Sequence, residues 1–167
     1  MPKTYTVDNT ANAPAPKIDD IAPAAPRGRA IQLNRLRVLG GKSFAGAGKS
    51  DMVMFSSWSS IGTTGLGHCL GLCLVWNKVG ETFEFGYCAH MSSVQGERFR
   101  ERLDEIKYAA PHNPWVAVSF GSVGGWAQTL TTALTNLGIA DNHIWIYQRA
   151  HGSTTFGVDR YGNFGEI

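Results

Sequence analysis

The chain has 167 residues with a formal net charge of +2, and 43% of its residues are hydrophobic. This length fits one folded domain with its own core. The small charge gives no support for a nucleic-acid partner, and no apolar run reaches the roughly 18 residues of a membrane span. Three cysteines cannot form a fully paired disulfide framework, and the N-terminus lacks the apolar segment of a secretory signal. We therefore expect a soluble protein that is cytoplasmic or exported without a conventional signal peptide.

Proline and alanine dominate the beginning of the chain. Five of the seven prolines fall within the first 26 residues. Proline lacks a backbone N–H, and such a segment has little apolar surface to bury. Residues 1–28 are therefore expected to form a flexible arm, either a plain leader or an export or docking tail. Residues 29–167 would form the folded domain.

After the arm, strand patterns alternate with turn signals. Strands are expected at 31–39, 115–120, 144–148 and 154–158, a short apolar run stands at 52–55, and 69–90 is expected to form a β-hairpin. Residues 40–50 are predicted to be a glycine-rich loop, and the Ser/Trp/Gly-rich stretch up to 67 is given no element. Tyr161-Gly162-Asn163 is typical of a turn.

Two helices are predicted in the second half of the chain. Ser92 and Gln95 have the spacing of a capping box, and Phe99, Leu103 and Ile106 follow at helical intervals. Gly121 to Gly125 would form a turn before the second helix, which carries leucines at 130, 134 and 137 and ends at Gly138. The order of elements indicates an α+β fold, a β-sheet or small sandwich with at least two helices packed on it.

The sequence also contains a misleading match to a nucleotide-binding loop. Gly48-Lys49-Ser50 ends such a motif, but Ser43 stands where its first glycine belongs. The residues that follow lack the helical period needed to bring a helix N-terminus to the phosphates. A loop without nucleotide binding is the expectation here.

The hairpin is the part of the sequence that carries chemistry. If its turn is centred between Val79 and Gly80, leucines of the first strand oppose apolar residues of the second and form one apolar face. On the other face Cys69 then lies directly opposite His90, where Cβ atoms are about 4.5–5.5 Å apart. Gly71 would leave room beside this pair for a substrate side chain.

Three interpretations compete for this cysteine and histidine cluster. A neighbouring imidazole can activate a thiol for nucleophilic catalysis. A zinc site would need Cys69, Cys73, Cys88 and His90, but two residues four apart on a strand are about 13 Å apart, too far for one zinc ion. Plain burial is the third possibility, and it is the one expected for Cys73 and Cys88.

A family resemblance favours catalysis. Residues 63–73 read Thr-Thr-Gly-Leu-Gly-His-Cys-Leu-Gly-Leu-Cys, and this stretch resembles the nucleophile motif of the CheD family, bacterial deamidases of chemoreceptor glutamines. That motif reads close to Thr-Leu-Gly-Leu-Gly-Ser-Cys-Val-Ala-Val-Cys. Residues 87–91 resemble the family's apolar-His-apolar segment, and the later order of elements is similar to the C-terminus. The same fold and Cys–His pair occur in the cytotoxic necrotizing factor toxins, which deamidate a glutamine of host small GTPases.

The resemblance implies a CheD-like or cytotoxic necrotizing factor-like fold with the catalytic Cys and His on adjacent strands. It implies a cysteine hydrolase that converts glutamine side chains of a partner protein to glutamate and ammonia. Cys69 would be the nucleophile, His90 the base, and Thr63 the group that orients the imidazole. Backbone N–H groups of the turn at 67–69 would stabilise the oxyanion. No cofactor and no metal are expected, and the partner would be a protein with an exposed glutamine.

Some features depart from the chemoreceptor enzymes. His68 replaces a small residue, and the loop at 151–155 lacks the arginine that those enzymes tend to carry near there. Together with the proline-rich arm, these departures favour a bacterial effector or toxin, with an intracellular chemoreceptor-type deamidase as the alternative. A non-catalytic binding domain with a packed Cys69 is the alternative of another class, and transglutamination or proteolysis would begin with the same step. His68 is a second possible base, whereas His112, His143 and His151 are expected to be ordinary surface or packed residues.

Overall fold

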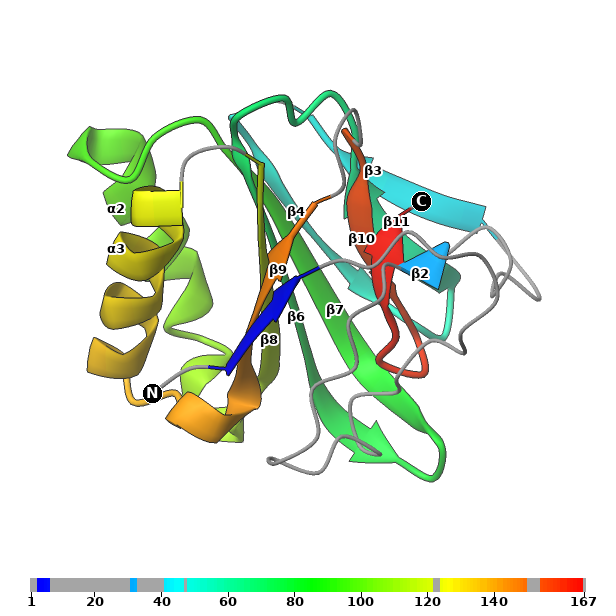
Figure 1. Ribbon diagram of the computed structural model, residues 1–167. Helices are drawn as coiled ribbons and strands as arrows, with labels where there is room; N and C mark the ends of the chain where they lie inside the picture. Colours follow the sequence, from blue (N-terminus) through cyan, green and yellow to red (C-terminus); the bar gives the residue numbers. More distant parts are fainter. Residues whose placement is uncertain are drawn as a thin grey trace.

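The computed structural model describes residues 3–6, 31–32, 41–46, 48–121, 124–149 and 154–166. Within these ranges two sheets pack against each other, and two helices cover the outer face of the larger sheet (Figure 1). The helices are α2 (Gly96–Ile106) and α3 (Gly124–Asn136). The strands are β1 (Lys3–Thr6), β2 (Ile31–Gln32), β3 (Gly41–Ala45), β4 (Ser50–Met54), β5 (Trp58–Thr63), β6 (Leu70–Val79), β7 (Thr82–Met91), β8 (Trp115–Phe120), β9 (Ile144–Gln148), β10 (Phe156–Asp159) and β11 (Phe164–Glu166).

The larger sheet has the strand order β1-β9-β8-β6-β7-β4. Its five strands from β9 to β4 form a mixed sheet, because β9 runs parallel to β8 while each of the other neighbours is antiparallel. The second sheet is built on the antiparallel strands β5, β10 and β11, with β3 and β2 at its two edges. The described residues form no closed barrel. The α+β class with helices packed on a sheet is confirmed.

Several elements lie where the sequence predicts them, and others do not. Strands β8 and β9 have the expected bounds, and both helices form. The predicted glycine-rich loop at 40–50 is wrong in its first half, because β3 occupies Gly41–Ala45, and β5 forms where no element was expected. The capping box is also wrong: the N-cap of α2 is Gln95, without a side-chain capping bond.

Two parts of the expected chain organisation fall partly outside the described residues. Of the arm at 1–28, residues 3–6 form β1, parallel to β9, and residues 7–28 lie outside the described ranges. The Lys-Thr-Tyr-Thr sequence of β1 is rich in β-branched and aromatic side chains, which favour strands. Of the strand expected at 31–39, β2 covers Ile31–Gln32, and 33–40 lie outside the described ranges.

The hairpin of β6 and β7 forms, but its register differs from the predicted one. Gly80 has a φ of +66° and Val79 pairs with Thr82, so the turn is centred after Gly80 rather than before it. Every pairing therefore shifts by two residues, and His90 lies opposite Gly71 instead of Cys69. A shift of two keeps each side chain on its predicted face. The apolar face is thus retained while the predicted cross-strand partners are wrong.

Each face of this hairpin is buried by a different layer. On one face lie Leu70, Leu72 and Leu74, which pack with residues of α2 and α3 such as Ile106 and Leu130. On the other face the second sheet packs against Cys73, Val75 and Cys88 of the hairpin. The helices and the second sheet lie on opposite sides of the large sheet in Figure 1.

Glycines on the second face let the two sheets approach closely. A Cβ atom on Gly86 would lie 2.4 Å from Phe55, and one on Gly71 would lie 3.2 Å from both Leu66 and Phe156. The space above Gly71, which was expected to receive a substrate side chain, is therefore filled by the core. Any substrate must approach Cys69 from the end of the hairpin.

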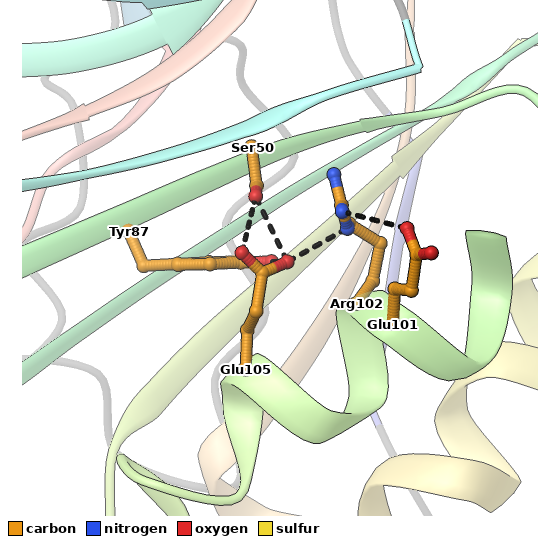
Figure 2. A network of polar contacts seen from close by, with 5 residues as sticks. All are labelled: Ser50, Tyr87, Glu101, Arg102 and Glu105. Carbon is orange, nitrogen blue, oxygen red and sulfur yellow. Dashed lines mark hydrogen bonds and ion pairs between the residues drawn. The ribbon is translucent and has the colours of Figure 1, made fainter.

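Helix α2 is also held to the sheet by a polar network (Figure 2). The Glu105 carboxylate accepts hydrogen bonds from Ser50 Oγ on β4 at 2.7 and 2.9 Å and from the Tyr87 hydroxyl on β7 at 3.3 Å. Arg102 forms an ion pair with Glu105 at 2.7 Å and a second with Glu101 at 3.4 Å. Burial and the nearby carboxylate of Glu105 raise the pKa of Tyr87. The network fixes α2 across the last two strands of the large sheet.

The Gly48-Lys49-Ser50 run leads into strand β4 rather than into a helix. It therefore lacks the helix N-terminus that a nucleotide-binding loop requires. No helix within the described ranges is long and apolar enough to cross a membrane.

Candidate active site

Cys69 lies in a tight turn just before β6. Its N–H donates to the Leu66 carbonyl at 2.6 Å, which closes a four-residue turn over 66–69. Gly67 has a φ of +51°, a left-handed conformation that favours glycine. The Leu66 N–H is bonded to the Thr154 carbonyl, so the turn is tied to the second sheet. The Cys69 side chain is partly exposed, which leaves its thiol open to a reactant.

His90 is buried near the end of β7, where the two sheets meet. Its Nδ1 lies 2.9 Å from Thr63 Oγ1, and the Thr63 hydroxyl donates to the Ala45 carbonyl at 2.8 Å. Because the hydroxyl has a single proton and a carbonyl cannot donate, the Thr63 oxygen must accept from Nδ1–H. Nε2 is therefore the unprotonated nitrogen of the neutral ring, available to accept a proton.

The structure brings Thr63 and His90 together but does not place Cys69 directly opposite the imidazole. In the observed register, Cys69 precedes by two residues the position opposite His90, and it lies in the turn before β6 begins. No hydrogen bond joins the Cys69 thiol to any described side chain.

The pKa shifts of Cys69 and His90 both favour the neutral forms of these groups near neutral pH. Burial raises the pKa of Cys69, although the nearby positive charge of Arg149 opposes this effect. Burial and Arg149 lower the pKa of His90, against a smaller opposite effect of the Thr64 backbone. The site thus holds a neutral thiol and a neutral imidazole rather than a preformed thiolate–imidazolium pair. A thiol in this state would need a general base to take its proton during an attack.

Arg149, immediately after β9, is a site residue that the sequence analysis missed. Its Nη2 donates to the carbonyls of Gly67 and Cys69, each at 2.8 Å. Its Nη1 donates to the carbonyl and the hydroxyl of Ser119 at 2.9 and 3.0 Å. Burial lowers the pKa of Arg149 to about 10, so the side chain remains cationic at neutral pH. The chemoreceptor enzymes tend to carry an arginine near the loop at 151–155. The arginine that donates to the turn at 66–69 is Arg149, which precedes this loop.

Gly121, at the end of β8, lies against the same turn. A Cβ atom at this position would lie 2.8 Å from the Gly67 carbonyl oxygen and 3.1 Å from Nη2 of Arg149. Only glycine leaves room there for the bond between Arg149 and Gly67. The glycine-rich segment 121–125 thus contributes a close backbone contact; its residues 122–123 lie outside the described ranges.

The other cysteines and histidines take no part in this arrangement. Cys73 and Cys88 lie directly opposite each other and are completely buried. His68 is exposed and contacts the edge of Trp126, and His143 stacks on Trp115 with ring centroids 3.8 Å apart. His112 is exposed, and His151 lies outside the described ranges. Among the described residues, no group of three or more His, Cys, Asp or Glu side chains is arranged to hold a metal ion.

No known relative supports the assignment of this site. The chain matches no family model, and no curated protein is significantly similar to it.

Proposed function

We propose that this protein is a cysteine-dependent deamidase that converts a glutamine side chain of a partner protein to glutamate. The observation that carries the proposal is the combination at the end of the hairpin. A partly exposed thiol lies just before β6, two residues before the position opposite a buried imidazole whose tautomer Thr63 fixes. The resemblance of residues 63–73 to the CheD motif assigns the same three residues, Cys69, His90 and Thr63, to a deamidase site.

The reaction follows from the neutral state of the two groups. As the Cys69 sulfur attacks the side-chain carbonyl carbon of the glutamine, its proton passes to Nε2 of His90. The imidazolium then protonates the leaving nitrogen, the C–N bond breaks, and ammonia departs from a thioester. His90 next takes a proton from water, which attacks the thioester and releases the glutamate side chain and the Cys69 thiol. Atoms balance as one water consumed and one ammonia released.

The turn at 66–69 would supply the oxyanion donor. The Cys69 N–H is already bonded to Leu66, so it is not available in this conformation. The N–H of His68 has no acceptor among the described residues and remains as the donor. A donor of this kind typically contributes about a hundredfold to a thousandfold in rate.

The nature of the substrate follows from access to the sulfur. The face above Gly71 is closed by Leu66 and Phe156, so an approaching glutamine must reach Cys69 from the exposed end of the turn. A side chain that protrudes from a protein surface or loop can do so. Two of the departures from the chemoreceptor enzymes, His68 and the proline-rich arm, favour an effector or toxin that acts on a foreign protein over a chemoreceptor-type enzyme of the same cell.

Alkylation tests the reactivity of the site without knowledge of the substrate. We expect native protein to take up one carbamidomethyl group from iodoacetamide, at Cys69, because Cys73 and Cys88 are completely buried. The Cys69→Ser variant should remain unlabelled. An inert Cys69 in the native protein would favour the non-catalytic binding domain.

Activity is tested by incubating wild type and Cys69→Ser with a bacterial lysate and, separately, with an animal cell lysate. Peptide mass spectrometry would identify glutamines converted to glutamate by wild type alone. Conversion in the bacterial lysate would support the chemoreceptor-type role, and conversion in the animal lysate the effector role. Glutamine cross-links or cleaved peptides would instead indicate a transglutaminase or a protease, and no difference from Cys69→Ser in either lysate would contradict the proposal.

A further inference from the structure

A buried cation, Arg149, donates hydrogen bonds to the turn at 66–69 that carries Cys69. Arg149 is 7% exposed and its four donated hydrogen bonds go to backbone or hydroxyl oxygens, not to a carboxylate. A buried charge of this kind is costly unless its hydrogen bonds are made. Two of the four end on the turn itself, at the carbonyls of Gly67 and Cys69. Arg149 therefore fixes the turn at 66–69 against the end of β8.

We propose that Arg149 is a positioning residue of the active site, which directs the His68 N–H outward as the oxyanion donor. This inference rests on the proposed deamidase function for its catalytic part. The geometry comes from the planarity of the peptide unit. In a trans peptide the C=O and N–H groups point in opposite directions, and the described chain has no cis peptide bond. Because the Gly67 carbonyl points at Arg149, the N–H of His68 in the same unit points away from it.

The positive charge of Arg149 gives the same residue a second effect on the site. Its guanidinium opposes the burial effect on Cys69 and so favours the thiolate as the proton leaves. A guanidinium also presents several donors in a rigid plane, whereas a lysine ammonium is a point charge on a flexible chain. Charge and orientation can therefore be separated by substitution, because Arg149→Lys keeps the first and loses the second.

Gly121 provides an independent way to disturb the turn. An alanine there would place its Cβ 2.8 Å from the Gly67 carbonyl oxygen and would push that carbonyl from Arg149 without removing the charge. Gly125, four residues later, is the matched control, because a Cβ added there would meet no atom within 4 Å. Neither glycine has a left-handed φ, so neither alanine is strained by the backbone conformation; Gly125 lies within α3, where alanine also favours the helix.

The first experiment measures the rate of iodoacetamide reaction with Cys69 as a function of pH, in wild type, Arg149→Lys and Arg149→Met. Arg149→Met should move the pH midpoint upward and slow labelling near pH 7.5 several-fold, while Arg149→Lys should keep the wild-type midpoint. Thermal unfolding of each variant is recorded in parallel. Equal effects of Lys and Met on the rate, with an unchanged midpoint in both, would overturn the charge part of the proposal.

The second experiment compares Gly121→Ala with Gly125→Ala on the glutamine conversion found in the lysates. Gly121→Ala should lower kcat on the order of tenfold to a hundredfold while its alkylation midpoint stays near wild type. Gly125→Ala should behave as wild type in both measurements. Equal kcat in a folded Gly121→Ala and wild type would overturn the positioning role. The alkylation profile needs no substrate, so a failure of the deamidase function would be visible separately from a failure of the Arg149 proposal.

Discussion

The two faces of the β6–β7 hairpin differ in what covers them and in what they carry. One face presents leucines and aromatic side chains to helices α2 and α3. The other presents Gly71, Gly86, Cys73, Cys88 and His90 to the second sheet. Large side chains fill the first interface, whereas on the second face glycines leave room for Phe55, Leu66 and Phe156.

We expect residues on the first face to matter mainly for stability and residues on the second face to matter mainly for the proposed reaction. The helix-covered face is an ordinary apolar core in which larger contact area gives more stabilisation. The sheet-covered face brings a polar pair, Thr63 and His90, into the interior, where their mutual hydrogen bond offsets the cost of burial. The partly exposed Cys69 lies at the end of this second face. Substitutions on the two faces should therefore have different consequences.

The largest effect on stability is expected on the helix-covered face. Leu72 is completely buried between the strands and the helices. Leu72→Ala should lower the free energy of unfolding by about 2–5 kcal/mol, measured by chemical denaturation. Val79 at the exposed tip of the same strand is the control, and Val79→Ala should change stability by less than about 0.5 kcal/mol. Similar losses at both positions would remove the distinction between core and tip.

A smaller loss is expected where the sheets approach each other. Gly86→Ala places a methyl group 2.4 Å from the buried ring of Phe55, so the ring or the strand must move. We expect a loss of about 1–3 kcal/mol in the free energy of unfolding. Gly125→Ala adds the same methyl group in open space and should leave stability unchanged or slightly higher. If Gly86→Ala is as stable as wild type, the close contact does not limit packing.

Thr63→Val tests whether the polar pair on the second face serves the reaction. The variant keeps the shape of the side chain but leaves the Ala45 carbonyl and His90 Nδ1 without this partner. Deamidation should fall on the order of tenfold to a hundredfold, because the tautomer and orientation of the base are no longer fixed. Stability should fall by about 1–2 kcal/mol. Thr63→Ser retains the hydroxyl and should restore most of the activity; a rate in Thr63→Val equal to wild type would exclude the orienting role.

The smallest effect concerns the pH dependence of stability. The pKa of His90 is lowered from its usual 6.5, so the unfolded chain binds this proton more readily than the folded protein. The contribution of His90 to stability is therefore complete above about pH 6.5 and is lost as pH falls toward the folded-state pKa. Wild type should lose more stability than His90→Gln between pH 7 and pH 5.5, with exposed His112→Gln as control. Parallel curves for wild type and His90→Gln would show that His90 is not the group responsible.

The sequence was sufficient to predict the two faces of the hairpin but not its register. Alternation of apolar residues in β6 and β7 depends only on which residues are odd or even, and a shift of two leaves it unchanged. The register depends on the position of the left-handed residue in the turn, and Gly80 was placed on the wrong side of its centre. The predicted direct opposition of Cys69 and His90 was lost for this reason, although the two residues remain on one face.

The second sheet and the role of Arg149 could not be predicted from the sequence, because both depend on contacts between residues that are far apart in the chain. Strand β5 reads as a Ser- and Gly-rich stretch, and its burial follows from pairing with β10, about a hundred residues later. Arg149 contacts carbonyls 80 and 82 residues earlier in the chain. Local periodicity carries no information about such contacts. The one available signal was a lone arginine directly after a buried strand, where a charge needs partners.

Cys73 and Cys88 face each other across the middle of the hairpin. The rate at which a reagent labels them would report how often this part of the protein opens. Their sulfur atoms become available to a reagent only when β6 and β7 separate from the second sheet. The slow appearance of a second and third label after the first thus reports how often the centre of the molecule unfolds. A single time course would then give both the reactivity of the outer thiol and the free energy that keeps the inner pair enclosed.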